Sequence, residues 1–189
     1  MLSSTPFPVS GLTSKPDTRR RPAAVQRLTN DFPEEAIGIM SLDQLYQQII
    51  LDHSKQRHGS GLAGTEAPDG TSTGQSHQLN PVCGDEVTLR LAVSDGTVQQ
   101  ISWDGAGCSI SMASASVLSD LGEGLSVEEL HSVIDNFREV LRSRGKVQAD
   151  PEILGDAAAF EGVARYAARV KCAMISWVAA EDALNQATA

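Results

Sequence analysis

The stretch VTLRLAVSDGTVQQISW, residues 87–103, decides the fold of this chain. From Val87 to Val93 every second residue is apolar, which is the period of a β-strand with one buried face. Ser94-Asp95-Gly96 supplies a turn. The apolar residues within 98–103 indicate a second strand that runs back along the first. The stretch therefore predicts two antiparallel strands joined by a tight turn.

Helical patterns flank this predicted hairpin on both sides. Ser41–Gln44 and Ser126–Glu129 are capping boxes, in which two side chains satisfy the free N–H groups at the start of a helix. Apolar residues then recur at helical spacing. We expect helices over about 42–58, 109–121 and 126–141, and a last helix that starts near Ala157 or near Ala168 and ends at Leu184. The predicted fold class is α+β, a small antiparallel β-sheet packed with several α-helices.

The first forty residues differ from the rest of the chain. Residues 1–40 contain five of the eight prolines and show neither a helical nor a strand period. We predict a disordered N-terminal extension there, followed by a single domain over 41–189. Met40 stands directly before a capping box, so it is either the true start of translation or the end of an ordinary flexible tail. Residues 59–79 are rich in Gly, Ser and Thr, and they are predicted to form a flexible loop.

Composition excludes several classes of function. The chain has a net charge of −9, and residues 41–189 hold 20 acidic against 10 basic residues, which disfavours binding to nucleic acid. No stretch approaches the roughly 20 apolar residues that cross a bilayer, and the N-terminus lacks the apolar segment of a secretory signal. We therefore predict a cytoplasmic protein that binds neither nucleic acid nor membranes.

Three cysteines each stand where a loop meets a predicted element. Cys83 precedes a strand, Cys108 lies between a strand and a helix, and Cys172 falls at or near the start of the last helix. An odd number of cysteines in a reducing compartment argues against disulfides. The hairpin brings Cys83 and Cys108 to one end of the sheet, and Asp85 shares the face of Cys83. Three thiols and a carboxylate suit zinc or an iron–sulfur cluster, and the alternative is a set of scattered structural cysteines.

Other residues capable of binding metals have simpler explanations. His53 lies on the apolar face of the first predicted helix and is expected to be a core or edge residue. His77 lies in the predicted loop, from which it could approach a metal transiently. Trp103 and Trp177 are expected in the core.

Four motifs occur in order along residues 41–184. They are Leu45-Tyr46 with Asp52-His53, Asn80-Pro81-x-Cys83-Gly84-Asp85, the run from Gly105 through Cys108 to Ser116, and Ala168-Arg169-Val170-Lys171-Cys172-Ala173 with Trp177. This set resembles the IscU/SufU (NifU N-terminal-like) family of iron–sulfur cluster assembly proteins. The resemblance implies that Cys83, Asp85, Cys108 and Cys172 surround one metal.

Three features resemble the SufU branch of that family more than the IscU branch. Lys171 stands where IscU proteins have a histidine, and the stretch 163–168 lacks their Leu-Pro-Pro-Val-Lys motif. The 63 residues between Cys108 and Cys172 leave room for the extra segment of SufU proteins. One departure is Tyr166-Ala167, where SufU proteins often have Phe-Pro. The resemblance thus implies zinc, a cysteine desulfurase (SufS-like) as partner, and downstream iron–sulfur assembly proteins.

The function implied is that of a zinc-dependent sulfurtransferase, which accepts persulfide sulfur from the desulfurase. The alternatives are a scaffold on which an iron–sulfur cluster is built and then transferred, and a zinc protein that only docks on partners. Because the acceptor is consumed and regenerated in each cycle, whether it counts as an enzyme is partly a matter of definition.

The resemblance also implies that a partner residue takes one zinc position and releases one cysteine. We expect that cysteine to be Cys83, because it follows the predicted loop and can swing out. Arg169 lies one helical turn before Cys172 if the helix includes it, and its charge is expected to steady a thiolate or persulfide. Removal of zinc by a chelator is expected to loosen the fold.

Overall fold

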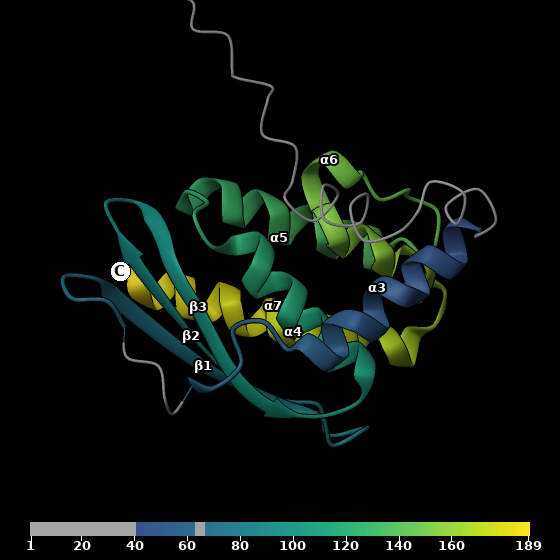
Figure 1. Cartoon of the computed structure of the whole chain (residues 1–189), viewed down its shortest axis with the longest axis horizontal. Coiled ribbons are helices and arrows are strands. Elements are labelled where there is room, and N and C mark those ends of the chain that lie inside the picture. The colour runs from purple at the N-terminus through teal and green to yellow at the C-terminus, as the bar shows by residue number, and fades with distance from the viewer. Residues whose placement is uncertain (1–40, 63–66) are drawn as a thin grey trace, which may run out of the picture.

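A computed structural model describes residues 41–62 and 67–189. The predicted N-terminal extension with Met40, and residues 63–66 of the predicted loop, lie outside the described residues. The strands β1 (Ser72–Leu79), β2 (Glu86–Ser94) and β3 (Thr97–Ala106) form one antiparallel sheet in the order β1-β2-β3. Together with the helices around it, this sheet makes the domain an α+β fold, as the sequence predicts (Figure 1).

The predicted hairpin corresponds to β2 and β3. Leu89 pairs with Trp103 across the two strands, and Ser94 pairs with Thr97 at the closed end. Asp95 and Gly96 between them have φ values of 50° and 70°. Positive φ at both central residues is the backbone of a two-residue hairpin turn, so the local sequence is sufficient to specify this part of the sheet.

The prediction that residues 72–79 belong to a flexible loop is wrong, because they form the edge strand β1. Gly74 pairs with Leu91, and Ser76 with Leu89, so both lie on the inner face of the sheet. A Cβ atom at Gly74 would collide with the backbone carbonyl of Ala183 in a neighbouring helix. The inner face of β1 therefore has no room for a side chain at Gly74, and its next residues are the polar Ser76 and Gln78, which contact Asp182 of the same helix. This face lacks the apolar alternation that marks a strand.

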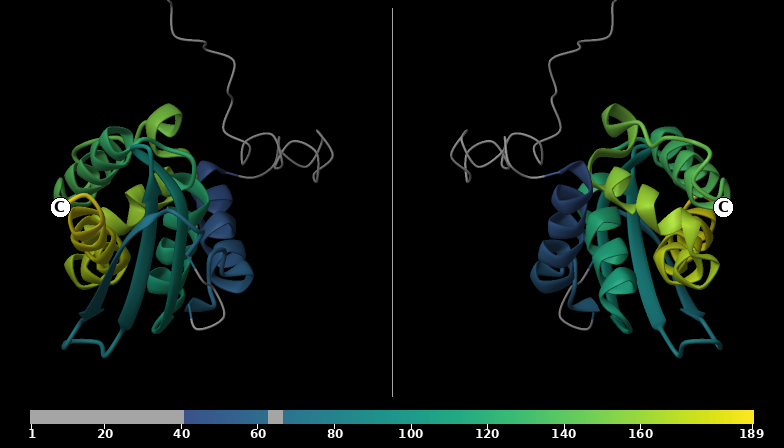
Figure 2. Two further views of the ribbon diagram at one scale, coloured as in Figure 1. Left: turned by 90° about the vertical axis from the view of Figure 1, so that its left-hand side faces the viewer. Right: turned by 90° about the vertical axis from the view of Figure 1, so that its right-hand side faces the viewer.

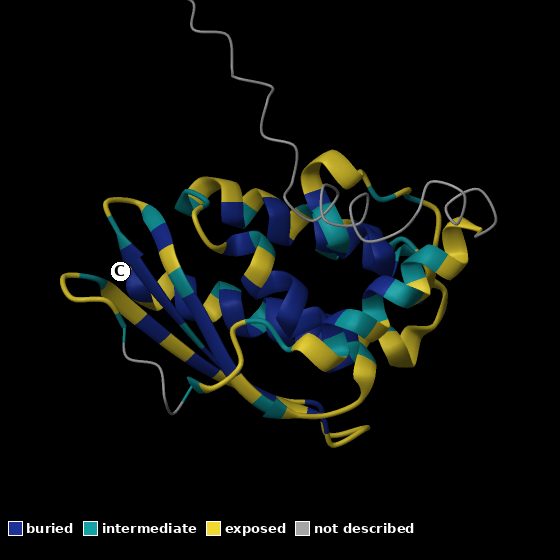
Figure 3. Ribbon diagram, viewed as in Figure 1, coloured by how far each residue is buried: buried dark blue, intermediate teal, exposed yellow. Residues whose placement is uncertain are grey.

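His77 also lies in β1 rather than in a loop. Its Nδ1 atom is 2.9 Å from Oγ1 of Thr88 on the adjacent strand. This contact is on the solvent side of the sheet, where residues of β1 are exposed (Figure 3). The prediction that His77 lies in a loop, from which it could approach a metal, is therefore wrong, because His77 lies in the strand β1.

Within the described residues, five α-helices and one 3₁₀ helix accompany the sheet. They are α3 (Leu42–Gln56), α4 (Ser109–Gly122), α5 (Val127–Arg142), α6 (Pro151–Leu154), η2 (Gly155–Arg165) and α7 (Ala167–Ala187). Both predicted capping boxes are present, at Ser41 and Ser126. Of the two predicted starts for the last helix, the one near Ala168 is right, because Tyr166 is extended and separates η2 from α7.

The core lies between the sheet and the helices. Helix α7 contacts β1, β2, α4 and α5, and Figure 2 shows it on the side of the molecule opposite α3. Trp103 and Trp177 are completely buried, as predicted. Phe137 of α5 stacks on Trp177, with 4.0 Å between the ring centroids.

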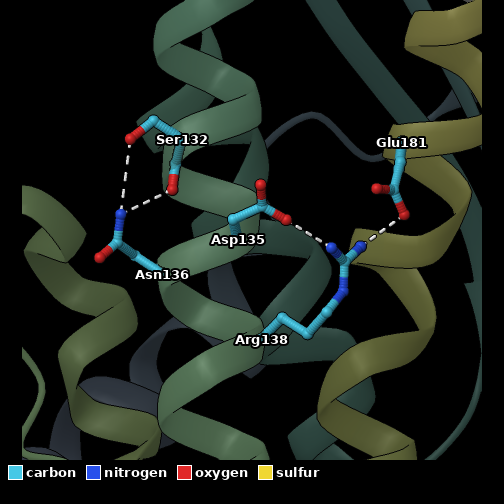
Figure 4. A network of polar contacts seen from close by, with 5 residues as sticks. All are labelled: Ser132, Asp135, Asn136, Arg138 and Glu181. Carbon is cyan, nitrogen blue, oxygen red and sulfur yellow. Dashed lines mark hydrogen bonds and ion pairs between the residues drawn. The ribbon is translucent and has the colours of Figure 1, made fainter.

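The outer edge of the α5–α7 contact is polar. Arg138 of α5 is paired with Asp135 of its own helix and with Glu181 of α7, at 2.5 Å in each case (Figure 4). On the side of α5 that faces away from α7, Asn136 donates to the carbonyl oxygen of Ser132 in its own helix. These contacts are partly open to solvent, so they supplement the apolar packing underneath.

His53 of helix α3 forms hydrogen bonds to residues of α4 and η2. The imidazole is buried, with Nδ1 2.9 Å from Oγ of Ser116 and Nε2 3.1 Å from Oδ2 of Asp156. His53 is therefore a core histidine, as expected, and both ring nitrogens have partners. Within the described residues, no helix combines the length and the apolar character needed to cross a membrane.

Candidate metal centre

The connection between β1 and β2 is a short loop held by its own hydrogen bonds. The N–H of Asn80 donates to the carbonyl oxygen of Asp85, and the N–H of Gly84 donates to that of Asn80, both at 2.8 Å. Gly84 has a φ of 76°, which glycine adopts without strain. The loop leaves Cys83 exposed and turns Asp85 inward. Cys83 thus stands in a hydrogen-bonded hairpin loop, and the expectation that it directly follows a flexible loop is wrong.

Cys108 is the N-cap residue of α4 and is exposed. Its backbone N–H donates to Oδ1 of Asp85 over 3.3 Å. Gly107 makes this approach possible, because a Cβ atom there would lie 2.9 Å from the Asp85 carboxyl carbon. The bend between β3 and α4 therefore brings Cys108 against the carboxylate.

Cys172 lies in the second turn of α7, one turn deeper in the helix than the sequence suggested. It is only 7% exposed. Its sulfur is 3.6 Å from the sulfur of Cys83 and 3.7 Å from the carbonyl oxygen of Ala168. No disulfide links the three cysteines, which are all free thiols.

The four residues predicted as ligands thus converge, although not equally. The possible ligand atoms of Cys83, Asp85 and Cys172 all lie within 4.8 Å of one another. Cys108 is not part of that group of three, and it contacts the group through Asp85. We refer to Cys83, Asp85, Cys108 and Cys172 as the thiol–carboxylate cluster.

The carboxylate at the centre of the cluster is stabilised in its charged form. Burial by itself would raise the pKa of Asp85. Hydrogen bonds from the hydroxyl of Ser111 and from the thiols of Cys172, Cys108 and Cys83 outweigh burial and hold the pKa below its usual value. Asp85 therefore keeps its negative charge inside the cluster at neutral pH.

The buried thiol behaves in the opposite way. Burial raises the pKa of Cys172, and the nearby Asp85 carboxylate and the other two thiols raise it further. A second negative charge next to Asp85 is unfavourable without a compensating cation. The Asp85 carboxylate is thus readily ionised. The Cys172 thiol needs a positive ion nearby before it ionises as well.

Ser111 is a residue of the site that the sequence reasoning missed. Its hydroxyl donates to Oδ2 of Asp85 and lies 3.5 Å from the sulfur of Cys108. The signal was present in the sequence, because a residue three positions after a helix-capping cysteine lies on the same side of the first turn. The serines of α4 were instead attributed to close helix packing alone.

Arg169 is exposed on α7, three residues before Cys172. Its guanidinium group lies over the ring of Tyr166, 4.8 Å from the centroid. No contact between Arg169 and a cysteine sulfur is found among residues 41–62 and 67–189. The predicted role of Arg169 in steadying a thiolate or persulfide stays a prediction.

The chemistry of the donor atoms fits zinc. Zinc in proteins takes four ligands, commonly thiolates, imidazoles and carboxylates. The cluster offers three thiols and one carboxylate from three separate parts of the fold, and two of these residues are buried. Soft thiolate donors also suit iron–sulfur clusters, so the donor set by itself permits both.

Known proteins resemble this chain over most of its length. The model of the family described as NifU-like N terminal domain matches residues 45–173. The zinc-dependent sulfurtransferase SufU of Bacillus subtilis is 36% identical over 141 residues, which cover 75% of this chain and 90% of that protein. The iron–sulfur cluster assembly scaffold protein IscU of Streptococcus pyogenes is 34% identical over 152 residues, or 79% of this chain and 89% of that protein.

Solved structures extend the likeness to the fold. The N-terminal part of a nitrogen-fixing NifU-like protein from Brucella abortus superposes with a TM-score of 0.62 at 26% identity. The superposition covers 78% of this chain and 96% of that one. The sheet and the helices that surround the thiol–carboxylate cluster are therefore arranged as in that protein.

Proposed function

Because the chain belongs to the family of NifU-like N-terminal domains, with SufU and IscU proteins of iron–sulfur cluster assembly among its relatives, we propose that it is a zinc-dependent sulfurtransferase. In this proposal it accepts persulfide sulfur from a SufS-like cysteine desulfurase and passes the sulfur to downstream assembly proteins. The reaction belongs to a reducing compartment such as the cytoplasm, where free thiols persist.

One observation supports this function above the others. The cluster pairs an exposed thiol, Cys83, with a buried thiol, Cys172, at a sulfur–sulfur distance of 3.6 Å. A carrier needs one sulfur that a partner can reach and others that remain anchored. Cys83 stands on the hairpin loop and meets the first need, while Asp85 and Cys172 are buried and meet the second.

The transfer step is a thiol–disulfide type exchange. The thiolate sulfur of Cys83 attacks the outer sulfur of the desulfurase persulfide, and a new S–S bond forms. The original S–S bond breaks, the desulfurase cysteine leaves as a thiolate, and the outer sulfur with its proton remains on Cys83. The exchange needs no external oxidant or reductant, because one persulfide is consumed and one is formed.

The cluster residues have distinct parts in this scheme. Cys83, Asp85, Cys108 and Cys172 would hold the zinc ion, and a bound zinc ion would keep the thiols deprotonated. Asp85 and Cys172 are the inner anchors, since both are buried. Cys83 is the residue we propose to be released toward the partner, because it is exposed on a loop rather than within an element.

The surroundings of Cys83 suit a protein partner. Leu79, Val82 and Tyr166 are exposed apolar residues, by 57%, 73% and 54%. Val82 precedes Cys83 directly, Leu79 ends β1, and Tyr166 lies just before α7. Apolar exposure next to a functional residue is typical of protein-binding surfaces, and Val82 beside Cys83 agrees with a persulfide presented by a desulfurase.

The proposal is tested by the turnover of the desulfurase. Adding the zinc-loaded protein to the cognate desulfurase and cysteine should raise the rate of alanine release. Cys83→Ala should abolish this stimulation, because no reachable thiolate remains to attack the persulfide. Mass spectrometry of the parent protein should find one added sulfur atom on the Cys83 peptide.

A matched control is Gln99→Ala, which changes an exposed residue toward the other end of β3. This variant should stimulate the desulfurase as the parent does. Absence of stimulation by the parent would refute the sulfurtransferase function. Stimulation that survives Cys83→Ala would assign the accepting thiol to another cysteine.

A second candidate function is supported by the same soft donor set. The thiol–carboxylate cluster also suits an iron–sulfur cluster, and one of the similar proteins is named an assembly scaffold. A scaffold would be recovered brown from anaerobic purification, with iron and acid-labile sulfide in equal amounts. A colourless protein that contains zinc alone favours the sulfurtransferase.

A further inference from the structure

We propose that Ser111 is a positioning residue of the metal centre, which fixes the Asp85 carboxylate for metal binding. The inference rests on the proposed function, because it assumes that the thiol–carboxylate cluster holds zinc. Ser111 is completely buried, so its hydroxyl depends on protein partners for its hydrogen bonds. Its partners are Oδ2 of Asp85 and the sulfur of Cys108.

The two oxygens of Asp85 have separate donors. Oδ2 accepts from the Ser111 hydroxyl, and Oδ1 accepts from the backbone N–H of Cys108 over 3.3 Å. Two hydrogen bonds to different oxygens fix both the position of a carboxylate and the rotation of its plane. Without Ser111, the Asp85 carboxylate would lose its hydroxyl donor and keep the backbone N–H of Cys108 and the weaker thiol donors.

The other buried serines of α4 serve different purposes. Ser114 donates to the carbonyl oxygen of Ala173 and accepts from the indole of Trp177. Ser116 contacts His53, and Ser119 donates to the carbonyl oxygen of Ala115 in its own helix. Of the buried serines on this helix, Ser111 is therefore the one whose hydroxyl contacts residues of the cluster.

The position of Ser111 follows from the start of α4. Cys108 is the N-cap of this helix, and the residue three places later lies above it on the same side. The 3.5 Å contact between the Ser111 hydroxyl and the Cys108 sulfur reflects this geometry. One hydroxyl thereby connects Cys108 with Asp85, while the sulfurs of Cys83 and Cys172 contact each other directly.

Loss of the hydroxyl should weaken metal binding more than it weakens the fold. Hydrogen-bond partners that orient metal ligands typically contribute about 10–100-fold to metal affinity. Ser111→Ala removes one oxygen atom and leaves the helix sequence otherwise unchanged. The variant should therefore fold, yet hold the Asp85 carboxylate less firmly.

The experiment compares Ser111→Ala with Ser119→Ala, a matched change at a second buried serine of α4. The dissociation constant for Zn²⁺ is measured by competition with a chromophoric chelator. Ser111→Ala should raise this constant by about 10–100-fold, while Ser119→Ala leaves it unchanged. Far-UV circular dichroism establishes that both variants are folded.

A spectroscopic readout separates positioning from general destabilisation. With Co²⁺ in place of Zn²⁺, the ligand-field bands report the donors and their geometry, and they should shift in Ser111→Ala alone. An unchanged zinc constant with unchanged bands would overturn the role of Ser111, and so would an equal loss of affinity in Ser119→Ala. Failure of the parent protein to bind zinc would instead refute the proposed function, and the inference with it.

Discussion

At the scale of single residues, the thiol–carboxylate cluster is divided by burial. Asp85 and Cys172 are buried, and Cys83 and Cys108 are exposed. The carboxylate is kept charged by its donors, whereas the thiol of Cys172 is kept neutral by burial and by that same carboxylate. Without metal, Asp85 therefore carries a negative charge, and the neighbouring thiol of Cys172 resists ionisation.

This difference predicts the order of alkylation in the reduced, metal-free protein. Cys172 should react with iodoacetamide more slowly than Cys83 or Cys108, because it is buried and its pKa is raised. A raised pKa lowers the thiolate fraction at every pH below it, so labelling of Cys172 should accelerate as the pH rises. Peptide mass spectrometry at neutral and alkaline pH measures the rate at each site.

Asp85→Asn provides the matched variant for that experiment. It removes a negative charge beside Cys172, which should lower the pKa of the thiol and speed its labelling at neutral pH. In denaturant the three cysteines should react alike. Equal rates for Cys172 and Cys83 in the folded protein would contradict the environment described for the buried thiol.

At the scale of elements, α7 is the helix that connects the site to the core. Cys172 lies in its second turn, and Trp177 lies about one and a half turns further along. Trp177 stacks on Phe137 of α5 and donates to the hydroxyl of Ser114 of α4. The position of the buried thiol is therefore set by aromatic packing and a buried hydrogen bond rather than by surface charge.

Two substitutions on α5 should separate the contribution of aromatic packing to stability from that of the ion pairs. Phe137→Ala should lower the free energy of unfolding by about 3–5 kcal/mol, because it leaves a cavity against Trp177. Arg138→Ala should cost less than about 1 kcal/mol, because its pairs with Asp135 and Glu181 are partly exposed (Figure 4). Urea denaturation followed by circular dichroism gives both values.

Ionic strength supplies the control for the comparison. The effect of Arg138→Ala should shrink further in high salt, while that of Phe137→Ala should not change. A larger loss for Arg138→Ala than for Phe137→Ala would mean that the ion pairs dominate the contact between α5 and α7.

At the scale of the whole molecule, the apolar core extends far beyond the thiol–carboxylate cluster. The core cluster runs from the strands through α4, α5 and α7, and it includes both tryptophans. Of the four cluster residues, Cys172 is buried directly beside Ala173 of this core, and Cys83 and Cys108 are exposed at its margin. Because the apolar core is extensive, we expect this domain to keep its fold without metal, unlike a zinc finger, which unfolds when the metal is removed.

Chelation of zinc should therefore lower the melting temperature without unfolding the protein at room temperature. Bound metal stabilises the folded state by mass action, and its removal loses that contribution. Thermal melts with and without a strong chelator measure the shift, and far-UV circular dichroism reports the helices. The loosening of the fold that we predict on chelation should be greatest in the loop 80–85 and the first turns of α7, which carry Cys83, Asp85 and Cys172.

Cys172→Ser serves as the comparison for this experiment, since it removes a buried member of the cluster. Its melting temperature should respond less to the chelator than that of the parent. A parent whose melting temperature does not change would leave zinc without a structural role. Complete loss of the helical signal at room temperature would show that the core is insufficient alone.

The sequence by itself determined the features that depend on neighbours in the chain. The hairpin of β2 and β3 follows from a strand period and a two-residue turn, and both capping boxes follow from side chains three residues apart. The order of motifs was also enough to indicate the family. These signals are local, so they need no knowledge of how distant segments pack.

The tertiary structure decided the features that depend on contacts between residues far apart in the sequence, namely the strand β1 and the contacts within the thiol–carboxylate cluster. β1 has no apolar alternation, because its inner face meets α7 through Gly74, where no side chain fits, and through the polar Ser76 and Gln78, and these contacts are visible only once the helix is in place. Ser111 and Asp85 are 26 residues apart, and Cys83 and Cys172 are 89 apart. Such contacts arise from packing of the sheet against α4 and α7, and packing is a property of the whole fold rather than of any stretch of sequence.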